Sequence, residues 1–248
     1  MMPARRLHSR GEPMAGIYVI KPAFQRSLGG IERWLVAHRV HPDWITGAAL
    51  VLSVGGGLCL YFAPHQLWLL ALVPVVAVVR TALNALDGLV AKSTGLARPW
   101  GEVLNELSDR FADVALLGGI ALAAPSSLLL GAGAITMMLL SSYLAILSKA
   151  AGGRRQYMGP MGKADRMVLL IIGSILGFFL PLGWVYNGML WVILVGCLVT
   201  LVRRTQATYA DLEPLAPGAS GSAGAPDAAD SSGASGPSGR PDPAGFAR

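Results

Sequence analysis

Three long stretches without a charged side chain constrain the fold of this chain more than any other feature. They cover residues 44–79, 114–148 and 167–202, and hold 36, 35 and 36 residues without Asp, Glu, Lys or Arg. A membrane-spanning helix needs about 20 apolar residues, so each stretch is too long for one span. Only 14% of all residues are charged, against about 25% in soluble domains. The chain is therefore predicted to be a polytopic membrane protein.

Each apolar stretch also carries a turn signal near its middle. Proline, glycine and small polar residues break the stretches at residues 63–66, 124–127 and around 181–187, because proline and glycine restrict or loosen the backbone. The three stretches then become three helical hairpins. We expect an all-α fold with six transmembrane helices, near residues 45–62, 67–87, 100–123, 127–148, 165–182 and 187–203.

Basic residues predict the orientation of these spans. None of the 20 Lys and Arg residues lies in the three hairpin turns; they lie in the N-terminal segment, in the connections after the second and fourth spans, and after the last span. The positive-inside rule makes that side cytoplasmic, with both termini. The net charge of +6 then reflects topology and anionic lipid rather than nucleic acid. The charged first 40 residues are not expected to form a cleavable signal peptide.

Composition divides the chain into three parts. Residues 1–16 are expected to be a flexible N-terminus, and residues 17–204 a membrane domain. Within it, residues 17–40 mix apolar and basic side chains at helical spacing, which favours an amphipathic helix in the headgroup layer; a helix that gates a site is the alternative. In residues 205–248, Ala, Gly, Pro and Ser supply 30 of 44 residues, which predicts a disordered tail.

The connection between the second and third spans is unusually charged. Residues 80–113 contain nine charged side chains, and ionisable groups at membrane depth are costly and usually face a cavity or a partner. Arg80 lies deepest, and we expect it to contact a lipid phosphate or a carboxylate such as Glu106 or Asp113; a snorkelling anchor is the alternative. The alternative for the whole cluster is that it forms two solvated, salt-bridged helix ends without a function.

Spacing in this connection favours a site over inert helix ends. Asn84 and Asp87 share one helix face, and Asn105 and Asp109 follow each other by one turn. Their carboxylate and amide oxygens are ligands that hard divalent cations prefer. Gly88 has no side chain, and neither has Gly101, so a phosphate or nucleotide can approach the backbone there.

At these positions the sequence resembles the CDP-alcohol phosphatidyltransferase family. The family pattern is D-x2-D-G-x2-A-R-x8-G-x3-D-x3-D, and this chain keeps every spacing with Asn84, Asp87, Gly88, Ala91, Lys92, Gly101, Asn105 and Asp109. Residues 159–166 also resemble the Gly-Lys element before the family's fifth helix. The sequence around the two asparagines resembles that of an asparagine-bearing bacterial branch of the family.

The resemblance implies an enzyme of phospholipid biosynthesis in the cell inner membrane, with its active site on the cytoplasmic side. Its partners are expected to be CDP-diacylglycerol, an alcohol acceptor and the lipid bilayer, with a homodimer as one possible assembly. It would move the phosphatidyl group of CDP-diacylglycerol to an alcohol and release CMP. Asp109 would be the catalytic base, and two Mg²⁺ or Mn²⁺ ions would be held by Asn84, Asp87, Asn105 and Asp109. The nucleotide and its diphosphate would lie against Gly88, Ala91, Lys92 and Gly101.

Asparagines at two aspartate positions reduce the negative charge of the expected metal site. Asp113 and Glu106 can supply the missing charge, or they can face solvent or pair with Arg110. The alternative function is therefore a catalytically degenerate lipid- or metal-binding membrane protein of the same fold. A divalent-cation transporter is disfavoured, because the charges gather at one membrane face.

Five cations in the connection before the fifth span point to the acceptor. Clustered cations suit a phosphorylated polyol such as glycerol phosphate or inositol phosphate, because phosphate favours several donors at once. We expect Lys163 and Arg166 to hold the acceptor phosphate, supported by Arg154 and Arg155, with Lys149 nearby. Positive-inside charge alone is the alternative explanation.

Overall fold

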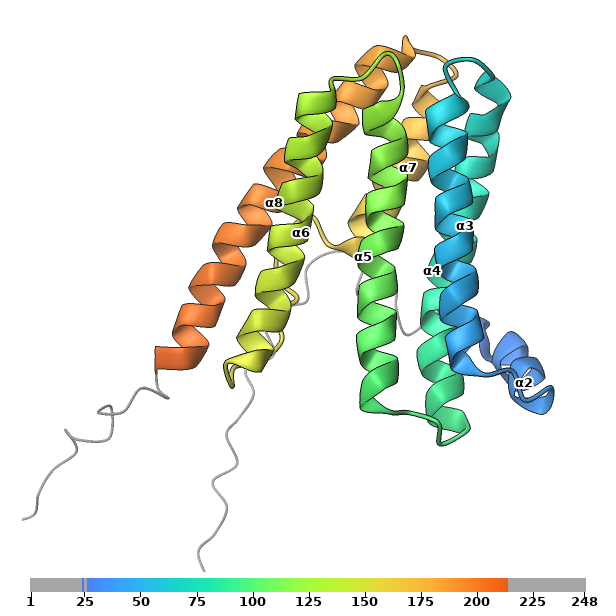
Figure 1. Cartoon of the computed structure of the whole chain (residues 1–248), viewed down its shortest axis with the longest axis vertical. Helices are drawn as coiled ribbons and strands as arrows, with labels where there is room; N and C mark the ends of the chain where they lie inside the picture. Colours follow the sequence, from blue (N-terminus) through green and yellow to red (C-terminus); the bar gives the residue numbers. More distant parts are fainter. Residues whose placement is uncertain (1–23, 25, 214–248) are drawn as a thin grey trace, which may run out of the picture.

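The computed structural model describes residues 24 and 26–213, and within this part of the chain every regular element is a helix. Figure 1 shows the helices in chain order. Their bounds are α2 Gly29–Ala37, α3 Pro42–Phe62, the 3-10 helix η2 Leu67–Ala71, α4 Leu72–Ser93, α5 Pro99–Leu122, α6 Leu128–Ala150, α7 Lys163–Leu176 and α8 Leu182–Leu212. The all-α fold predicted from the sequence is confirmed.

Four of these helices are long and apolar enough to cross a membrane: α3, η2 continued by α4, α6 and α8. The other two bundle helices occupy predicted spans without meeting this criterion. α5 carries charged side chains through its first half, and α7 has only 14 residues. A polytopic chain is therefore supported by four helices, and the α5 and α7 segments differ for identifiable reasons of charge and length.

Two predicted boundaries are wrong. The third hairpin turns at residues 177–181 instead of 181–187, because Pro181 caps α8 and the helix starts at Leu182. At its other end α8 continues to Leu212, so residues 205–212 belong to a helix and not to a tail. Asp211 in that last turn accepts hydrogen bonds from Arg154 (3.0 Å) and Gln156 (2.7 Å). Residues 1–16 and 214–248 lie outside the described residues.

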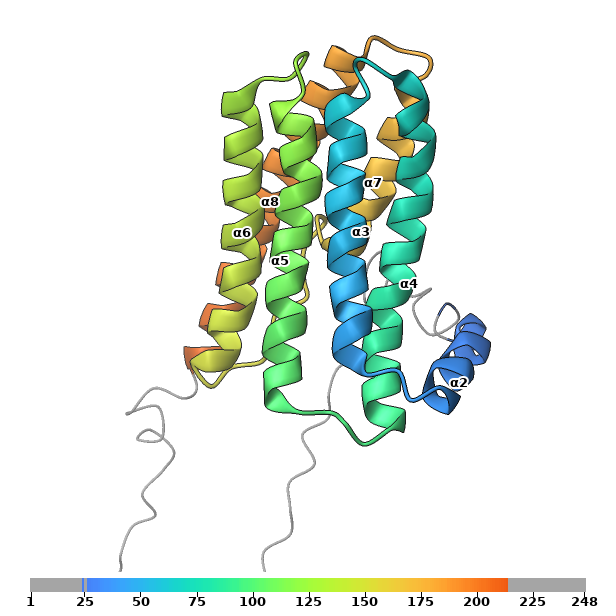
Figure 2. The ribbon, with the colours of Figure 1, turned by 45° about the vertical axis from the view of Figure 1, so that its right-hand side comes forward.

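The bundle is held together by close helix packing around α3 and α5. A Cβ added to Gly57 would lie 2.3 Å from the Ala115 carbonyl oxygen, and one added to Gly119 would lie 2.1 Å from that of Gly57. Glycine therefore lets the two backbones approach directly. α4 packs on the other side of α3, α6 packs between α5 and α8, and α7 closes the bundle against α4 and α8 (Figures 1 and 2).

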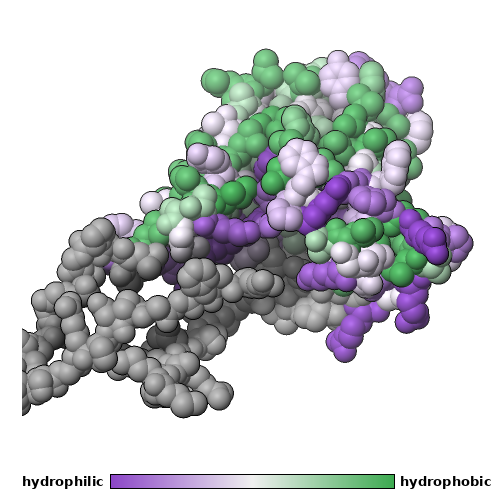
Figure 3. All heavy atoms as spheres, turned by 60° about the horizontal axis from the view of Figure 1, so that its bottom comes forward, coloured by the Kyte–Doolittle hydropathy of each residue, from purple (hydrophilic) through white to green (hydrophobic). Residues whose placement is uncertain are grey.

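The two ends of the bundle differ in polarity. The turns at 63–66, 123–127 and 177–181 meet at the upper end in Figures 1 and 2, and no charged residue lies in them. The lower end carries the connections after α4 and α6, and α2 lies there beside α4. With this end turned forward, hydrophilic side chains gather on its visible part, while the face above them is largely hydrophobic (Figure 3).

Helix α2 covers only part of the predicted amphipathic segment, since residues 17–23 and 25 are outside the described residues. None of its own residues is buried. Leu28, just before it, is buried against Ile45 of α3 and Leu86 and Val90 of α4. The described part of the segment is thus attached to the polar end of the bundle at its first turn.

Candidate active site

Two cavities open at the polar end of the bundle, with volumes of about 560 and 520 Å³. The first lies between α4, α5 and α7, and the second between α3, α4 and the start of α5. Four residues line both cavities: Asp87, Gly88, Lys92 and Asn105. The cavities therefore meet at the α4–α5 face that the sequence singled out.

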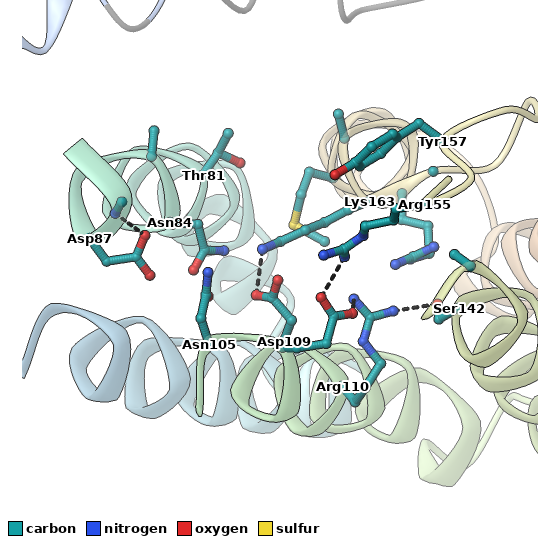
Figure 4. A pocket seen from close by; sticks show the side chains of 18 of the residues that line it. Thr81, Asn84, Asp87, Asn105, Asp109, Arg110, Ser142, Arg155, Tyr157 and Lys163 are labelled. Carbon is teal, nitrogen blue, oxygen red and sulfur yellow. Dashed lines mark hydrogen bonds and ion pairs between the residues drawn. The ribbon is translucent and has the colours of Figure 1, made fainter. Parts of the chain in front are cut away.

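The four predicted metal-ligating residues come together in the first cavity. Asn84 and Asp87 come from α4, and Asn105 and Asp109 from α5, with the two asparagines pointing toward each other between the two aspartates (Figure 4). Thr46 of α3 donates a hydrogen bond to Asp87 Oδ2 (3.0 Å), and the Gly88 amide donates to Oδ1 (2.6 Å). Both hydrogen bonds orient the Asp87 carboxylate.

The asparagines offer unused hydrogen-bonding capacity. Asn84 Nδ2 and Asn105 Oδ1 are buried without a hydrogen-bond partner, and a buried unpaired polar atom is costly. The oxygen and nitrogen of an amide exchange places by a flip of the group, so either asparagine can present an oxygen to the cavity. Two carboxylates with two amide oxygens fit a hard divalent cation. No group of three or more His, Cys, Asp or Glu side chains suited to a metal occurs among the described residues.

Lys163 reaches this site because α7 begins halfway up the bundle. Residues 151–162 climb from the end of α6 to the start of α7 (Figure 1). Gly159 makes this path possible, with a φ of +118° and a position where a Cβ would lie 2.5 Å from Thr200. The ammonium group of Lys163 forms an ion pair with Asp109 Oδ1. The predicted base and a predicted phosphate-binding residue are therefore direct partners.

A second ionic group lines the side of the cavity. Glu106 of α5 pairs with Arg110 (3.2 Å) and with Arg155 from the 151–162 connection (2.5 Å). Burial lowers the pKa of Arg155, but the charge and hydrogen bond of Glu106, together with Tyr157 and Glu102, outweigh burial and raise the pKa above its ordinary value, so the guanidinium stays charged. Arg110 also donates to Ser142 of α6. Glu106 is thus paired with arginines, and its pairing with Arg110 is one of the alternatives that the sequence left open.

A fully buried ionic cluster lies about one helical turn deeper in the bundle than the site. Asp113 of α5 accepts from Arg80 of α4 (2.8 Å) and from Arg166 of α7 (2.5 Å). The predicted contact of Arg80 with a carboxylate is therefore confirmed for Asp113, and Arg80 is no snorkelling anchor. The prediction that Asp113 contributes to the metal site is not supported by this geometry, because both carboxylate oxygens are occupied by arginines.

The five cations expected at the acceptor site separate into groups. Lys163 and Arg155 line the cavity, and Arg166 lies at its floor, bonded to Asp113 and to the Met161 carbonyl (3.3 Å). Arg154 is highly exposed and pairs with Asp211. Lys149 is exposed and pairs with Glu102 (2.6 Å). Neither Arg154 nor Lys149 lines the first cavity, so the cluster is smaller than its spacing in sequence suggested.

The second cavity contains all four residues expected at the nucleotide. Gly88, Ala91, Lys92 and Gly101 line it together. A Cβ on Gly88 would meet nothing within 4 Å, and one on Gly101 would meet only Arg98 Cγ at 3.5 Å. Arg98 and Asp43 form an ion pair beside this cavity. Open space at both glycines is what an approaching diphosphate needs.

Sequence reasoning missed two residues that line or support the site. Thr46 orients Asp87 across 41 positions of sequence. Arg204 of α8 lines the first cavity and donates to the carbonyls of Met158 (3.0 Å) and Ser141 (2.6 Å). Thr46 carries no local signal, and Arg204 is indistinguishable by sequence from other basic residues that end a span.

No family model matches the chain. Two curated relatives are similar to it over most of their length. Inner membrane protein YnbA of Escherichia coli is 34% identical over 177 residues, which are 71% of this chain and 88% of YnbA. Phosphatidylinositol phosphate synthase of Mycolicibacterium smegmatis is 28% identical over 203 residues, 78% of this chain and 89% of that enzyme.

Solved structures of Mycobacterium tuberculosis phosphatidylinositol phosphate synthase (PgsA1) share the fold. The structure with CDP-DAG bound gives a TM-score of 0.60 at 21% identity, covering 81% of this chain and all of that chain. The complex with manganese and citrate gives 0.61 at 22% identity, covering 81% and 95%.

Proposed function

This chain belongs to the CDP-alcohol phosphatidyltransferase family, and on that premise we propose that it transfers the phosphatidyl group of CDP-diacylglycerol to an alcohol in phospholipid biosynthesis. The observation that carries the proposal is the meeting of Asn84, Asp87, Asn105 and Asp109 where the two cavities join. The second cavity takes the CDP moiety, and the first takes the acceptor.

The transfer is one displacement at phosphorus. The acceptor hydroxyl oxygen forms a bond to the phosphorus that carries diacylglycerol, and the bond from that phosphorus to CMP breaks. Asp109 takes the hydroxyl proton, which requires its carboxylate within hydrogen-bond reach of the hydroxyl. Lys163, already paired with Asp109, fixes the carboxylate at the cavity wall. Phosphatidyl lipid and CMP are the products.

We further propose that the reaction uses Mg²⁺ or Mn²⁺. Asp87, Asp109 and the amide oxygens of Asn84 and Asn105 would hold the cation. When bound, it would neutralise charge on the diphosphate and on the leaving CMP. The buried, unpartnered amide atoms of the two asparagines support this assignment, and the relative PgsA1 binds manganese.

A phosphorylated polyol is the acceptor that the first cavity favours. Lys163 and Arg155 line it from one side, and the family relatives named phosphatidylinositol phosphate synthase suggest an inositol phosphate. Arg166 contributes from the cavity floor, where its guanidinium is shared with Asp113. Arg154 pairs with Asp211 of α8 and therefore stabilises that helix rather than binding the acceptor.

The membrane arrangement follows from the same helices. We propose six spans, in which α5 and α7 also cross the membrane, with α2 lying in the headgroup layer. By the positive-inside rule, the basic residues at the lower end of the bundle support a cytoplasmic position of both termini and of the site, and the relative YnbA is named an inner membrane protein. A homodimer would bury part of the apolar outer face.

The test is CMP release by purified protein given CDP-diacylglycerol, with and without Mn²⁺, across a panel of acceptors. We expect release that needs Mn²⁺ and is fastest with inositol phosphate or glycerol phosphate. Asp109→Ala should abolish release, whereas Lys149→Ala, outside the cavity, should leave it nearly unchanged. Intact protein that binds CDP-diacylglycerol but never releases CMP would support the degenerate lipid-binding alternative instead.

A further inference from the structure

The cavity that should hold a divalent cation is already rich in positive charge. Among the described residues that line the first cavity, six are Lys or Arg and only three are acidic: Asp87, Glu106 and Asp109. Four aspartates at the motif positions would have reversed part of this balance, but two of those positions are Asn84 and Asn105. A divalent cation that enters this cavity alone would be repelled by the Lys and Arg side chains that line it. The repulsion is strong because a divalent ion is itself among the largest local charges in a site.

Most of the available negative charge is also committed to protein cations. Glu106 is paired with Arg110 and Arg155, and Asp109 with Lys163. Asp87 is different, because its two oxygens receive hydrogen bonds only from the uncharged donors Thr46 and Gly88. Among the described residues no cation forms an ion pair with Asp87. One carboxylate is therefore left to attract a divalent cation.

The unpartnered amides lie beside this carboxylate. Asn84 is one turn before Asp87 on α4, and Asn105 faces both from α5 (Figure 4). Each has a buried atom without a hydrogen-bond partner. These amides can complete the coordination of one ion, but they add no charge for a second. The free-energy cost of removing two divalent ions from water would exceed the stabilisation that two carboxylates can supply.

We propose that this site binds a single divalent cation, and binds it together with the diphosphate of the CDP donor rather than before it. The inference rests on the proposed function, because the donor phosphates supply the negative charge that Asn84 and Asn105 lack. The geometry supports joint binding, since Asp87, Gly88, Lys92 and Asn105 line both cavities. Coupling of this kind is reciprocal, so the cation must tighten nucleotide binding by the same factor.

The measurement is direct Mn²⁺ binding to the full-length protein in detergent, followed by the electron paramagnetic resonance signal of free Mn²⁺. CDP, the soluble part of the donor, is the probe of coupling. We expect one Mn²⁺ per chain when CDP is saturating, and at least a tenfold weaker affinity without CDP, after correction for Mn²⁺ bound to CDP in solution. Two ions bound without CDP, equal affinity with and without it, or no binding with CDP would each overturn the proposal.

Restoring the missing charge gives a matched test. Asn84→Asp combined with Asn105→Asp should raise the affinity for Mn²⁺ without CDP at least tenfold and raise the stoichiometry to two. Gln66→Glu adds an acidic group at the opposite end of the bundle, where Gln66 is exposed and accepts from Trp68, and should change neither value. An unchanged stoichiometry in the folded double variant would contradict the proposal, with folding checked by its thermal transition.

Failure of this inference can be told apart from failure of the proposed function. The binding experiment requires no turnover and uses CDP alone. A chain that shows coupled, single-ion binding but no CMP release would retain the inference and lose the enzymatic activity. A chain that releases CMP while binding two ions in the absence of CDP would do the reverse.

Discussion

At the scale of single residues, Lys163 connects the predicted base to the predicted acceptor site. Its ammonium group pairs with Asp109, and its side chain lines the first cavity. Lysine presents a compact point charge, which suits a phosphate that several donors share. The residue therefore has two proposed roles, to hold the Asp109 carboxylate and to contact the acceptor phosphate.

Lys163→Ala should raise the Michaelis constant for the phosphorylated acceptor at least tenfold, with a much smaller effect on that for CDP-diacylglycerol. Initial rates with each substrate varied in turn provide the measurement. Lys149→Ala is the matched control, because Lys149 is exposed and pairs with Glu102 away from the first cavity. Equal increases for both substrates would remove Lys163 from the acceptor site.

Local spacing in the sequence predicted which candidate site residues share a helix face. Asn84 and Asp87 share one helix, as do Asn105 and Asp109, so spacing alone placed each pair on one face. Contacts across long separations carried no such signal. Thr46 with Asp87, and Arg166 with Asp113, depend on how α3 and α7 pack against α4 and α5.

At the scale of helices, the buried cluster of Arg80, Asp113 and Arg166 ties α4, α5 and α7 together. Each member lies about one helical turn farther into the bundle than a site residue on the same helix. Arg80 lies deeper than Asn84, Asp113 deeper than Asp109, and Arg166 deeper than Lys163. The cluster thereby fixes how the three helices present the site. Its ionic partners are almost completely buried.

Asp113→Asn should destabilise the protein strongly, because it leaves two buried guanidinium groups without a charged partner. Removing one member of a buried ion pair costs about 3–5 kcal/mol. Glu102→Gln breaks an exposed pair with Lys149 and should cost less than about 1 kcal/mol. Thermal unfolding in detergent, followed by a thiol-reactive fluorophore at Cys59 and Cys197, measures both. Equal transitions would mean that the cluster does not hold the helices.

Helix existence was predictable from hydropathy, whereas two helix ends were not. Polar and small residues after Arg204 suggested a tail, but contacts of Asp211 with Arg154 and Gln156 stabilise a further helical segment. At α7, twelve residues of connection, 151–162, pack into the bundle and delay the helix. Both outcomes depend on tertiary contacts that override local composition.

At the scale of the whole molecule, the separation of polar and apolar ends predicts the orientation in the membrane. The uncharged turns lie at one end, and the basic connections and both cavities lie at the other. Under the positive-inside rule we expect the cavity end to face the cytoplasm. CDP-linked donors and phosphorylated acceptors would then enter the site from the cytoplasm.

This orientation is testable by labelling in intact cells, in a background with Cys59 and Cys197 replaced by Ala. A membrane-impermeant thiol reagent should modify Gln66→Cys, in the turn after α3, without permeabilisation. Ala151→Cys, after α6, should react only once the inner membrane is opened. Both residues are exposed, so accessibility within the protein does not differ. The reverse pattern would place the site on the other side.

Isotope tracing can follow the proposed transfer of the phosphatidyl group itself. Purified protein would receive Mn²⁺, inositol phosphate and CDP-diacylglycerol labelled at the phosphorus that bears diacylglycerol. We predict that the label appears in a phosphatidyl lipid containing the acceptor, that CMP is released unlabelled in equal amount, and that Asp109→Ala forms neither. Labelled phosphatidic acid as the sole product, or no product from correctly folded protein with any acceptor of the panel, would rule out the proposed phosphatidyl transfer.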